Sequence, residues 1–134
     1  MALRFFSFIV LILSFFSPTY AYAQASYISG SDLLRACKKS LFISEGIMAS
    51  ATSEDMLQGG WCVGVVAAAR DINAGATEGG LLPRQYGVCL PSGGVINEQA
   101  IRIVVHYLEE NPHQLHIPAA VVATLAFRGS FPCR

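Results

Sequence analysis

The segment from Tyr107 to Ala119, YLEENPHQLHIPA, gathers two of the chain's three histidines and two adjacent carboxylates within thirteen residues. His113 and His116 are three residues apart, and Glu109 and Glu110 precede them. Imidazole and carboxylate groups are ordinary zinc ligands. The segment is therefore either a metal site or the polar joint between two helices.

Two prolines favour the second interpretation, a polar joint between two helices. Pro112 and Pro118 flank the histidines, which places the imidazoles in a turn rather than at the i, i+4 positions that metal-binding helices use. Charged and polar side chains at a turn are usually solvated. We expect no metal in this segment and a solvated turn between packed helices. His106, the remaining histidine, is expected on a helix surface.

No other group of residues suggests catalysis. The chain contains no G-x-S-x-G elbow and no glycine-rich phosphate loop after a strand. Cysteines held in disulfides supply no thiolate nucleophile. We expect neither an enzyme nor a cofactor-binding protein.

The cysteines indicate disulfides. All four follow the first 23 residues, at Cys37, Cys62, Cys89 and Cys133. An even number in a small exported domain predicts two bridges, for which three pairings exist. A zinc site is the alternative, but the chain has no CxxC spacing to support it.

The first 23 of the 134 residues have the form of a cleaved signal peptide. Arg4 precedes the twelve-residue apolar run FFSFIVLILSFF, which is too short to span a bilayer, and AYA supplies a cleavage site before Gln24. The expected mature protein, residues 24–134, is a single exported domain. Removing Arg4 leaves eight basic against nine acidic side chains, a balance that favours neither nucleic acid nor an anionic membrane as partner.

The clearest helix follows Ile96. Asn97 is the expected N-cap, and Ile96 can pack on Ile101 as a hydrophobic staple. Asn111 precedes a proline and should end the helix. The spacing of one apolar face predicts the buried residues Ile101, Val104, Val105 and Leu108.

The next helix should form an antiparallel hairpin with this one, because the connection between them is short. Pro118 suits its first position, and Gly129 suits a left-handed C-terminal turn. Its expected apolar stripe consists of Val121, Val122, Leu125 and Ala126.

Two helices are expected upstream. The first is SDLLRACKKSL, capped by Ser31 or Asp32, with Leu33, Leu34, Cys37 and Leu41 on one face. The second is EDMLQGGWCVGVVAAARDI, with the face Leu57, Trp61, Val65, Ala68 and Ile72, on which Trp61 is expected to be a core residue. Its glycines, Gly59, Gly60 and Gly64, are expected where a neighbouring helix packs closely.

The remaining segments, Phe42–Ser53 and Asn73–Gly94, are expected to be irregular. The chain therefore predicts an all-α bundle of about four helices stapled by disulfides. Helix ends that meet in such a bundle indicate the pairing Cys37–Cys62 and Cys89–Cys133.

The C-terminal string CLPSGGVINEQAIRIVVHYLEENPHQLHIPAAVVATLAFRGSFPC, residues 89–133, resembles the Rap1a/Tai immunity protein family. The shared parts are the Cys-Leu-Pro opening, the helix with its VV-x-YL pattern, the NPHQLH-x-PAA joint and the closing FPC. Further upstream, GWCVGVVAAARD is similar to the family's central helix.

This resemblance implies a periplasmic, all-helical, disulfide-bonded immunity protein that often forms a homodimer. Such proteins block the active-site groove of a type VI secretion peptidoglycan amidase. On this hypothesis the irregular segments Phe42–Ser53 and Asn73–Val88 form the contact surface, with Leu82, Arg84 and Tyr86 as anchors. The alternative is a periplasmic stress or chaperone-like protein without a toxin partner, which would expose apolar surface in acid.

Overall fold

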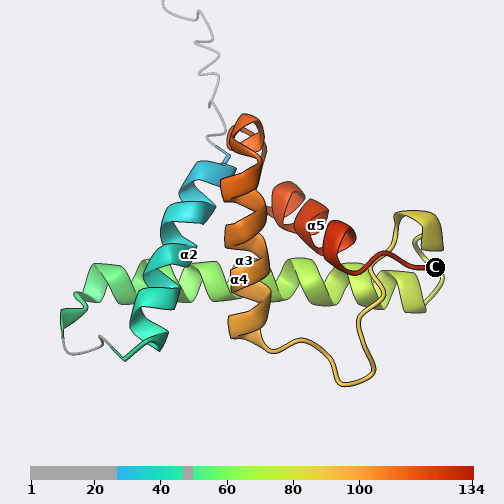
Figure 1. The fold of residues 1–134 in the computed structure, drawn as a ribbon, viewed down its shortest axis with the longest axis horizontal. Helices are drawn as coiled ribbons and strands as arrows, with labels where there is room; N and C mark the ends of the chain where they lie inside the picture. Colours follow the sequence, from blue (N-terminus) through green and yellow to red (C-terminus); the bar gives the residue numbers. More distant parts are fainter. Residues whose placement is uncertain (1–26, 47–49) are drawn as a thin grey trace, which may run out of the picture.

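The computed structural model describes residues 27–46 and 50–134, which form an all-α fold (Figure 1). This confirms the expected fold class, and four α-helices lie within the described ranges. The predicted signal peptide lies outside them. No helix in the described part is both long and apolar enough to cross a membrane. The elements are α2 Gly30–Ser44, α3 Ser53–Glu78, the 3-10 turn η3 Arg84–Tyr86, α4 Asn97–Glu110, the 3-10 turn η4 Pro112–Gln114 and α5 Ala119–Ser130.

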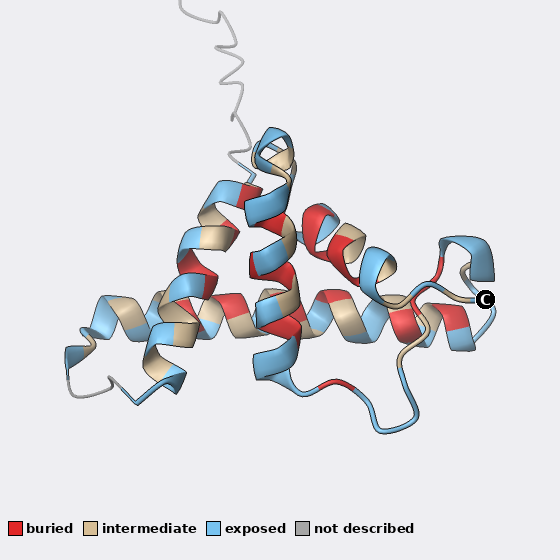
Figure 2. Cartoon of the chain, in the orientation of Figure 1, coloured by how far each residue is buried: buried red, intermediate tan, exposed pale blue. Residues whose placement is uncertain are grey.

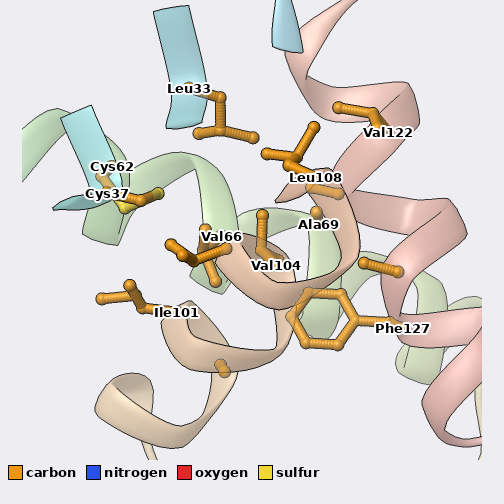
Figure 3. Packing of buried hydrophobic residues seen from close by; sticks show 14 of the residues in the cluster. Leu33, Cys37, Cys62, Val66, Ala69, Ile101, Val104, Leu108, Val122 and Phe127 are labelled. Atoms are coloured by element: carbon orange, nitrogen blue, oxygen red, sulfur yellow. A yellow bond between two sulfur atoms is a disulfide. The ribbon is translucent and has the colours of Figure 1, made fainter. Parts of the chain in front are cut away.

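Helix α3, with 26 residues, is the element against which α2, α4 and α5 all pack. In Figure 1 α2 and α4 cross in front of it, and α5 lies beside α4. The buried residues gather where these helices face one another (Figure 2). Figure 3 shows the centre of this core, whose largest fully buried side chains include Phe127, Leu33, Leu108, Val66, Val104 and Val122.

Helix α4 buries the predicted stripe but begins differently from the prediction. All four stripe residues are less than 10% exposed. Asn97 is the first helical residue rather than the N-cap, and its Oδ1 accepts a hydrogen bond from Arg70 Nη1 at 3.1 Å. Ile96 occupies the N-cap position with 71% of its surface exposed, so the expected staple on Ile101 is wrong.

Helix α5 departs from its prediction at both ends. Pro118 is the N-cap rather than the first helical residue. Gly129 lies inside the helix, and its φ is not positive, so it does not form the expected left-handed turn. Val121 is 49% exposed, and the buried stripe instead consists of Ala119, Val122, Ala123, Ala126 and Phe127.

Helix α2 starts two residues earlier than expected, because its cap is Ser29 and not Ser31 or Asp32. Ser29 Oγ accepts a hydrogen bond from the Asp32 amide at 3.3 Å, and the Asp32 carboxylate accepts one from the Ser29 amide at 3.0 Å. This reciprocal capping box satisfies two of the amides that every helix N-terminus leaves free. On the predicted face, Leu33 and Cys37 are fully buried.

The predicted face of α3 is confirmed only in part. Trp61 and Val65 are partly buried and pack against the core, but Leu57 is 70% exposed and Ile72 is 69% exposed. The helix instead turns a stripe of smaller residues toward the core, at Gly59, Cys62, Val66, Ala69 and Thr77.

The small size of these residues lets α2 come close. A Cβ at Gly59 would lie 3.3 Å from Ser40 Cα and 3.2 Å from Ile43 Cδ1. Gly60 and Gly64 face outward, with no described atom within 4 Å of such a Cβ. Only Gly59 therefore fulfils the expected packing role toward a neighbouring helix of the same chain.

Both expected irregular segments are shorter than predicted. Helix α2 continues to Ser44, and α3 continues to Glu78, so residues 42–44 and 73–78 are helical. Thr77 explains the second extension, because it is 4% exposed and its hydroxyl donates to Asn73 O at 2.7 Å. A buried residue one turn past the expected end keeps the helix packed.

Replacing Gly59 with valine should destabilise the fold by about 1–3 kcal/mol, because the added atoms would push α2 away from α3. The matched control, Gly60→Val, adds the same side chain on the outward surface and should be neutral or slightly stabilising. Urea unfolding of the two oxidised variants checks this. Equal midpoints for both variants would contradict the close packing at Gly59.

Candidate functional site

The histidine-containing segment is a structural joint between α4 and α5. Tyr107 Oη donates to Gln114 Oε1 at 2.8 Å, and the amide nitrogen of the Asn111 side chain donates to Tyr107 O at 2.8 Å. The carbonyls of Leu115 and Ile117 accept hydrogen bonds from the first amides of α2, at 2.9 and 2.8 Å. The joint therefore caps a third helix as well as connecting two.

The imidazoles of this segment do not converge. His113 and His116 are both exposed, and His106 Nε2 lies 3.3 Å from Glu110 Oε2 on the surface of α4. Glu109 is instead paired with Lys38 of α2 at 2.7 Å. Across residues 27–46 and 50–134, no three histidine, cysteine or acidic residues form a group able to hold a metal.

The two disulfides join Cys37 to Cys62 and Cys89 to Cys133, which is the predicted pairing. The first links α2 to α3 inside the core, and both of its cysteines are fully buried. The second links the chain before α4 to the chain after α5, and both of its cysteines are partly exposed. One bridge therefore belongs to the core and the other to the surface.

The second disulfide is one of three fixed points of the connection between α3 and α4, residues 79–96, which we term the α3–α4 loop. Cys89 N also donates to Phe131 O at 3.0 Å. Val88 N donates to the buried hydroxyl of Thr77 at 3.2 Å. Arg70 Nη1 donates to Val95 O at 2.6 Å.

A glycine is required where this loop returns to α3. A Cβ at Gly87 would lie 2.4 Å from Thr77 Oγ1, so no larger residue fits without a shift. Gly80, with a φ of +72°, makes the turn by which the chain leaves α3. These constraints hold the loop at its base and leave residues 81–86 and 91–94 as its exposed parts, with Leu82 only partly exposed.

The predicted anchors all lie in the first of these parts, residues 81–86. Arg84 and Tyr86 are exposed, and Arg128 of α5 lies over the Tyr86 ring at 5.6 Å from its centroid. Leu82 is only partly exposed, and its amide donates to Ala76 O at 2.9 Å, as the Leu81 amide does at 2.8 Å. Leu81, which the sequence did not single out, is 85% exposed and presents the loop's largest apolar surface.

The other expected contact segment, Phe42–Ser53, is only partly described. Its residues 42–44 belong to α2, and residues 47–49 lie outside the described residues. Thr52 caps α3 with a second capping box, in which its hydroxyl oxygen accepts from the Asp55 amide at 3.1 Å. Lys39 of α2 pairs with Asp55 at 2.6 Å. The described ends of this segment therefore belong to α2 or cap α3.

A family model for the Rap1a immunity proteins matches residues 29–133. The matched range runs from the cap of α2 to the last cysteine and contains all four described α-helices. The comparison with curated proteins finds no match, and neither does the comparison with solved structures.

The difference in burial predicts an order of reduction. Mild reductant under native conditions should open Cys89–Cys133 first, because thiol exchange requires access to a sulfur. Alkylation followed by peptide mapping should then find label on Cys89 and Cys133 while Cys37 and Cys62 stay bridged. Label appearing first on Cys37 and Cys62 would contradict this assignment.

Proposed function

The chain belongs to the Rap1a immunity protein family, and we propose that it protects its cell by binding and blocking a type VI secretion peptidoglycan amidase in the periplasm. Family membership and two disulfides both point to an exported protein that binds an effector. The observation that carries the amidase-blocking proposal is the α3–α4 loop, a projecting segment whose base is fixed at three points.

A fixed loop suits a protein that blocks a groove. Loops that are ordered before binding lose less conformational entropy in the complex, so more of the contact energy appears as affinity. The three fixed points of the α3–α4 loop leave two short exposed stretches, residues 81–86 and 91–94, of which the first holds the larger side chains. Interfaces favour aromatic and arginine side chains at their centres, and the first stretch holds Arg84 and Tyr86 beside the exposed Leu81.

Inhibition would need no catalytic group of its own. The projecting loop would enter the amidase groove and exclude its substrate, while the helical bundle behind it keeps the loop in place. Leu81 would provide apolar contact, and Tyr86 would keep its ring oriented by the Arg128 guanidinium above it. Leu82, whose side chain is only partly exposed, would support the loop more than it touches the amidase.

The first test is whether the oxidised protein without residues 1–23 binds any member of a panel of purified type VI peptidoglycan amidases and stops peptidoglycan cleavage. We expect a stable complex and loss of cleavage for one member. Tyr86→Ala and Leu81→Asp should each raise the dissociation constant of the complex by about thirtyfold, which is the loss of affinity typical of an interface hot spot.

His113→Ala is the matched control, because His113 is exposed on the joint and makes only a 3.4 Å contact with Gln114. It should inhibit as well as the unmodified protein. Unchanged inhibition by both loop variants would remove the α3–α4 loop from the contact surface.

A stress or chaperone-like role is the second candidate, and the acidic helix caps favour it. The Lys39 ammonium and the Thr52 cap groups lower the pKa of Asp55 to about 2. Hydrogen bonds from Ser29 lower the pKa of Asp32. Both carboxylates stabilise the fold while ionised, so acid removes support from the starts of α3 and α2 together.

Because the pKa of Asp55 is about 2 in the folded chain and near 3.8 unfolded, its contribution is complete above pH 3.8 and disappears as the pH falls toward 2. Asp55→Asn should therefore be less stable than the unmodified protein at neutral pH and lose less stability on acidification. Glu54→Gln, one residue away and exposed, is the control. Urea unfolding midpoints measured at neutral pH and between pH 3.8 and 2 check this prediction. If the stability of Asp55→Asn depends on pH in the same way as that of the unmodified protein, the Asp55 cap has no such role.

A hydrophobic dye added to the oxidised protein near pH 2 separates the two functions. Strong dye binding together with suppressed aggregation of a client protein supports the stress role. A protein that stays folded without binding dye speaks against that role.

A further inference from the structure

The described part of the chain distributes its charges unevenly. Residues 27–46 and 50–134 contain eight basic and nine acidic side chains. Five of the basic side chains pair with carboxylates: Arg35 with Asp32, Lys38 with Glu109, Lys39 with Asp55, Arg70 with Asp71, and Arg102 with Glu45 and Glu98. The other three, Arg84, Arg128 and Arg134, form no ion pair and donate no hydrogen bond within these ranges.

These three arginines lie together around the first stretch of the α3–α4 loop. Arg84 begins the turn η3, and Arg128 lies over the ring of Tyr86 in the same turn, at 5.6 Å from its centroid. Arg134 directly follows the cysteine that is disulfide-bonded to the loop. In Figure 1 the C-terminus accordingly lies beside this loop. We term Arg84, Tyr86, Arg128 and Arg134 the arginine surface.

The segments that carry the arginine surface hold no acidic side chain. Residues 79–97 and 119–134 contain neither aspartate nor glutamate. Glu78, the last residue of α3, is the nearest acidic residue before the loop, and within the described ranges it pairs with none of the three arginines. Counting both Glu78 and the carboxylate that follows Arg134 still leaves a positive excess. The remaining described residues, with five basic and eight acidic side chains, are negative.

The contact between Arg128 and Tyr86 leaves the guanidinium able to bind an acceptor. Arg128 is half-buried, and its guanidinium carbon lies over the ring. A guanidinium that stacks on a ring keeps its N–H donors at the edge of its plane, where two of them match the two oxygens of a carboxylate. None of these donors has an acceptor in the described part of the chain. They are free for an acceptor on another molecule.

We propose that the arginine surface binds a group of carboxylates on an acidic protein, and that this protein is the effector blocked by the loop. The inference rests on the proposed function, because the first stretch of the loop is the contact surface in both. The exposed Arg84 and Arg134 attract the acidic rim of the amidase groove. Arg128 then binds a carboxylate of that rim beside Tyr86. An amidase with a basic rim is repelled, so the arginine surface selects among effectors.

A protein fits this surface better than an anionic membrane does. Segments that bind anionic lipids carry clusters of about four to eight lysines or arginines, whereas only three arginines meet here. They also stand beside apolar groups, since Leu81 is 85% and Tyr86 is 51% exposed in the same stretch as Arg84. Aromatic and arginine side chains together are typical of protein interfaces.

Association kinetics with the silenced amidase test the charge of the arginine surface. The double variant Arg84→Gln with Arg134→Gln should associate about tenfold more slowly than the unmodified protein at low salt, because opposite charges accelerate encounter. At about 0.5 M salt the difference should disappear, because charges are screened. The matched control, Arg35→Gln with Arg102→Gln, removes two positive charges from exposed ion pairs elsewhere. It should slow association by less than about threefold.

Conservative variants separate attraction by charge from binding by a guanidinium. Arg84→Lys keeps the charge and should associate as fast as the unmodified protein. Arg128→Lys also keeps the charge but loses the paired donors, so its complex should dissociate about fivefold faster while its association rate stays unchanged. Equal slowing by the two double variants, or slowing that persists at high salt, overturns the proposal.

A probe that needs no amidase separates this inference from the proposed function. Isotope-labelled protein without residues 1–23 is titrated with a glutamate homopolymer, and separately with vesicles of equal parts phosphatidylglycerol and phosphatidylcholine. Amide NMR shifts at residues 81–89 and 126–134 that the homopolymer causes, and that the double variant Arg84→Gln with Arg134→Gln loses, support the arginine surface even if no amidase is silenced.

Three results overturn the arginine surface. They are the absence of these shifts, shifts confined to other helices, and binding to the vesicles in preference to the homopolymer. An amidase silenced equally fast by every charge variant also removes the arginine surface, but it leaves the proposed inhibition standing.

Discussion

The close crossing of α2 over α3 at the Cys37–Cys62 disulfide governs how the rest of the bundle is built. The bridge holds the two Cα atoms 5.1 Å apart, a separation that leaves little room for side chains between the helices. Helix α3 meets this constraint by turning Gly59 and other small residues inward. Its larger residues Leu57 and Ile72 are consequently left exposed, so one covalent constraint shapes both the core and the exposed apolar surface.

The Cys89–Cys133 disulfide imposes a second and different constraint. Closing loops with sequence separations of 25 and 44 residues stabilises the fold by about 3.5 and about 4 kcal/mol in the chain-entropy model, a large share of the roughly 5–15 kcal/mol typical of a domain. The surface bridge also fixes the base of the α3–α4 loop, together with Thr77 and Arg70. Stability and loop order therefore depend on the same bond.

Sequence periodicity predicted α4 well because only one apolar stripe exists on that helix. Helix α3 carries two stripes at three- and four-residue steps, one rich in large residues and one in small residues. Size alone favours the first stripe, but Cys62 belongs to the second, and a cysteine paired with another helix must face that helix. The predicted disulfide pairing thus contained the information needed to orient α3 correctly.

The helix starts were harder to predict, because contacts between distant segments determine them. Gly30 N donates to Ile117 O and Ala119 N donates to Ile28 O, both at 2.8 Å, so the starts of α2 and α5 hold each other. No local pattern around Ser29 reveals that bond. The exposed Leu81 was missed for a related reason: its neighbour Leu82 looks equivalent in sequence, and only the path of the chain around Gly80 separates them.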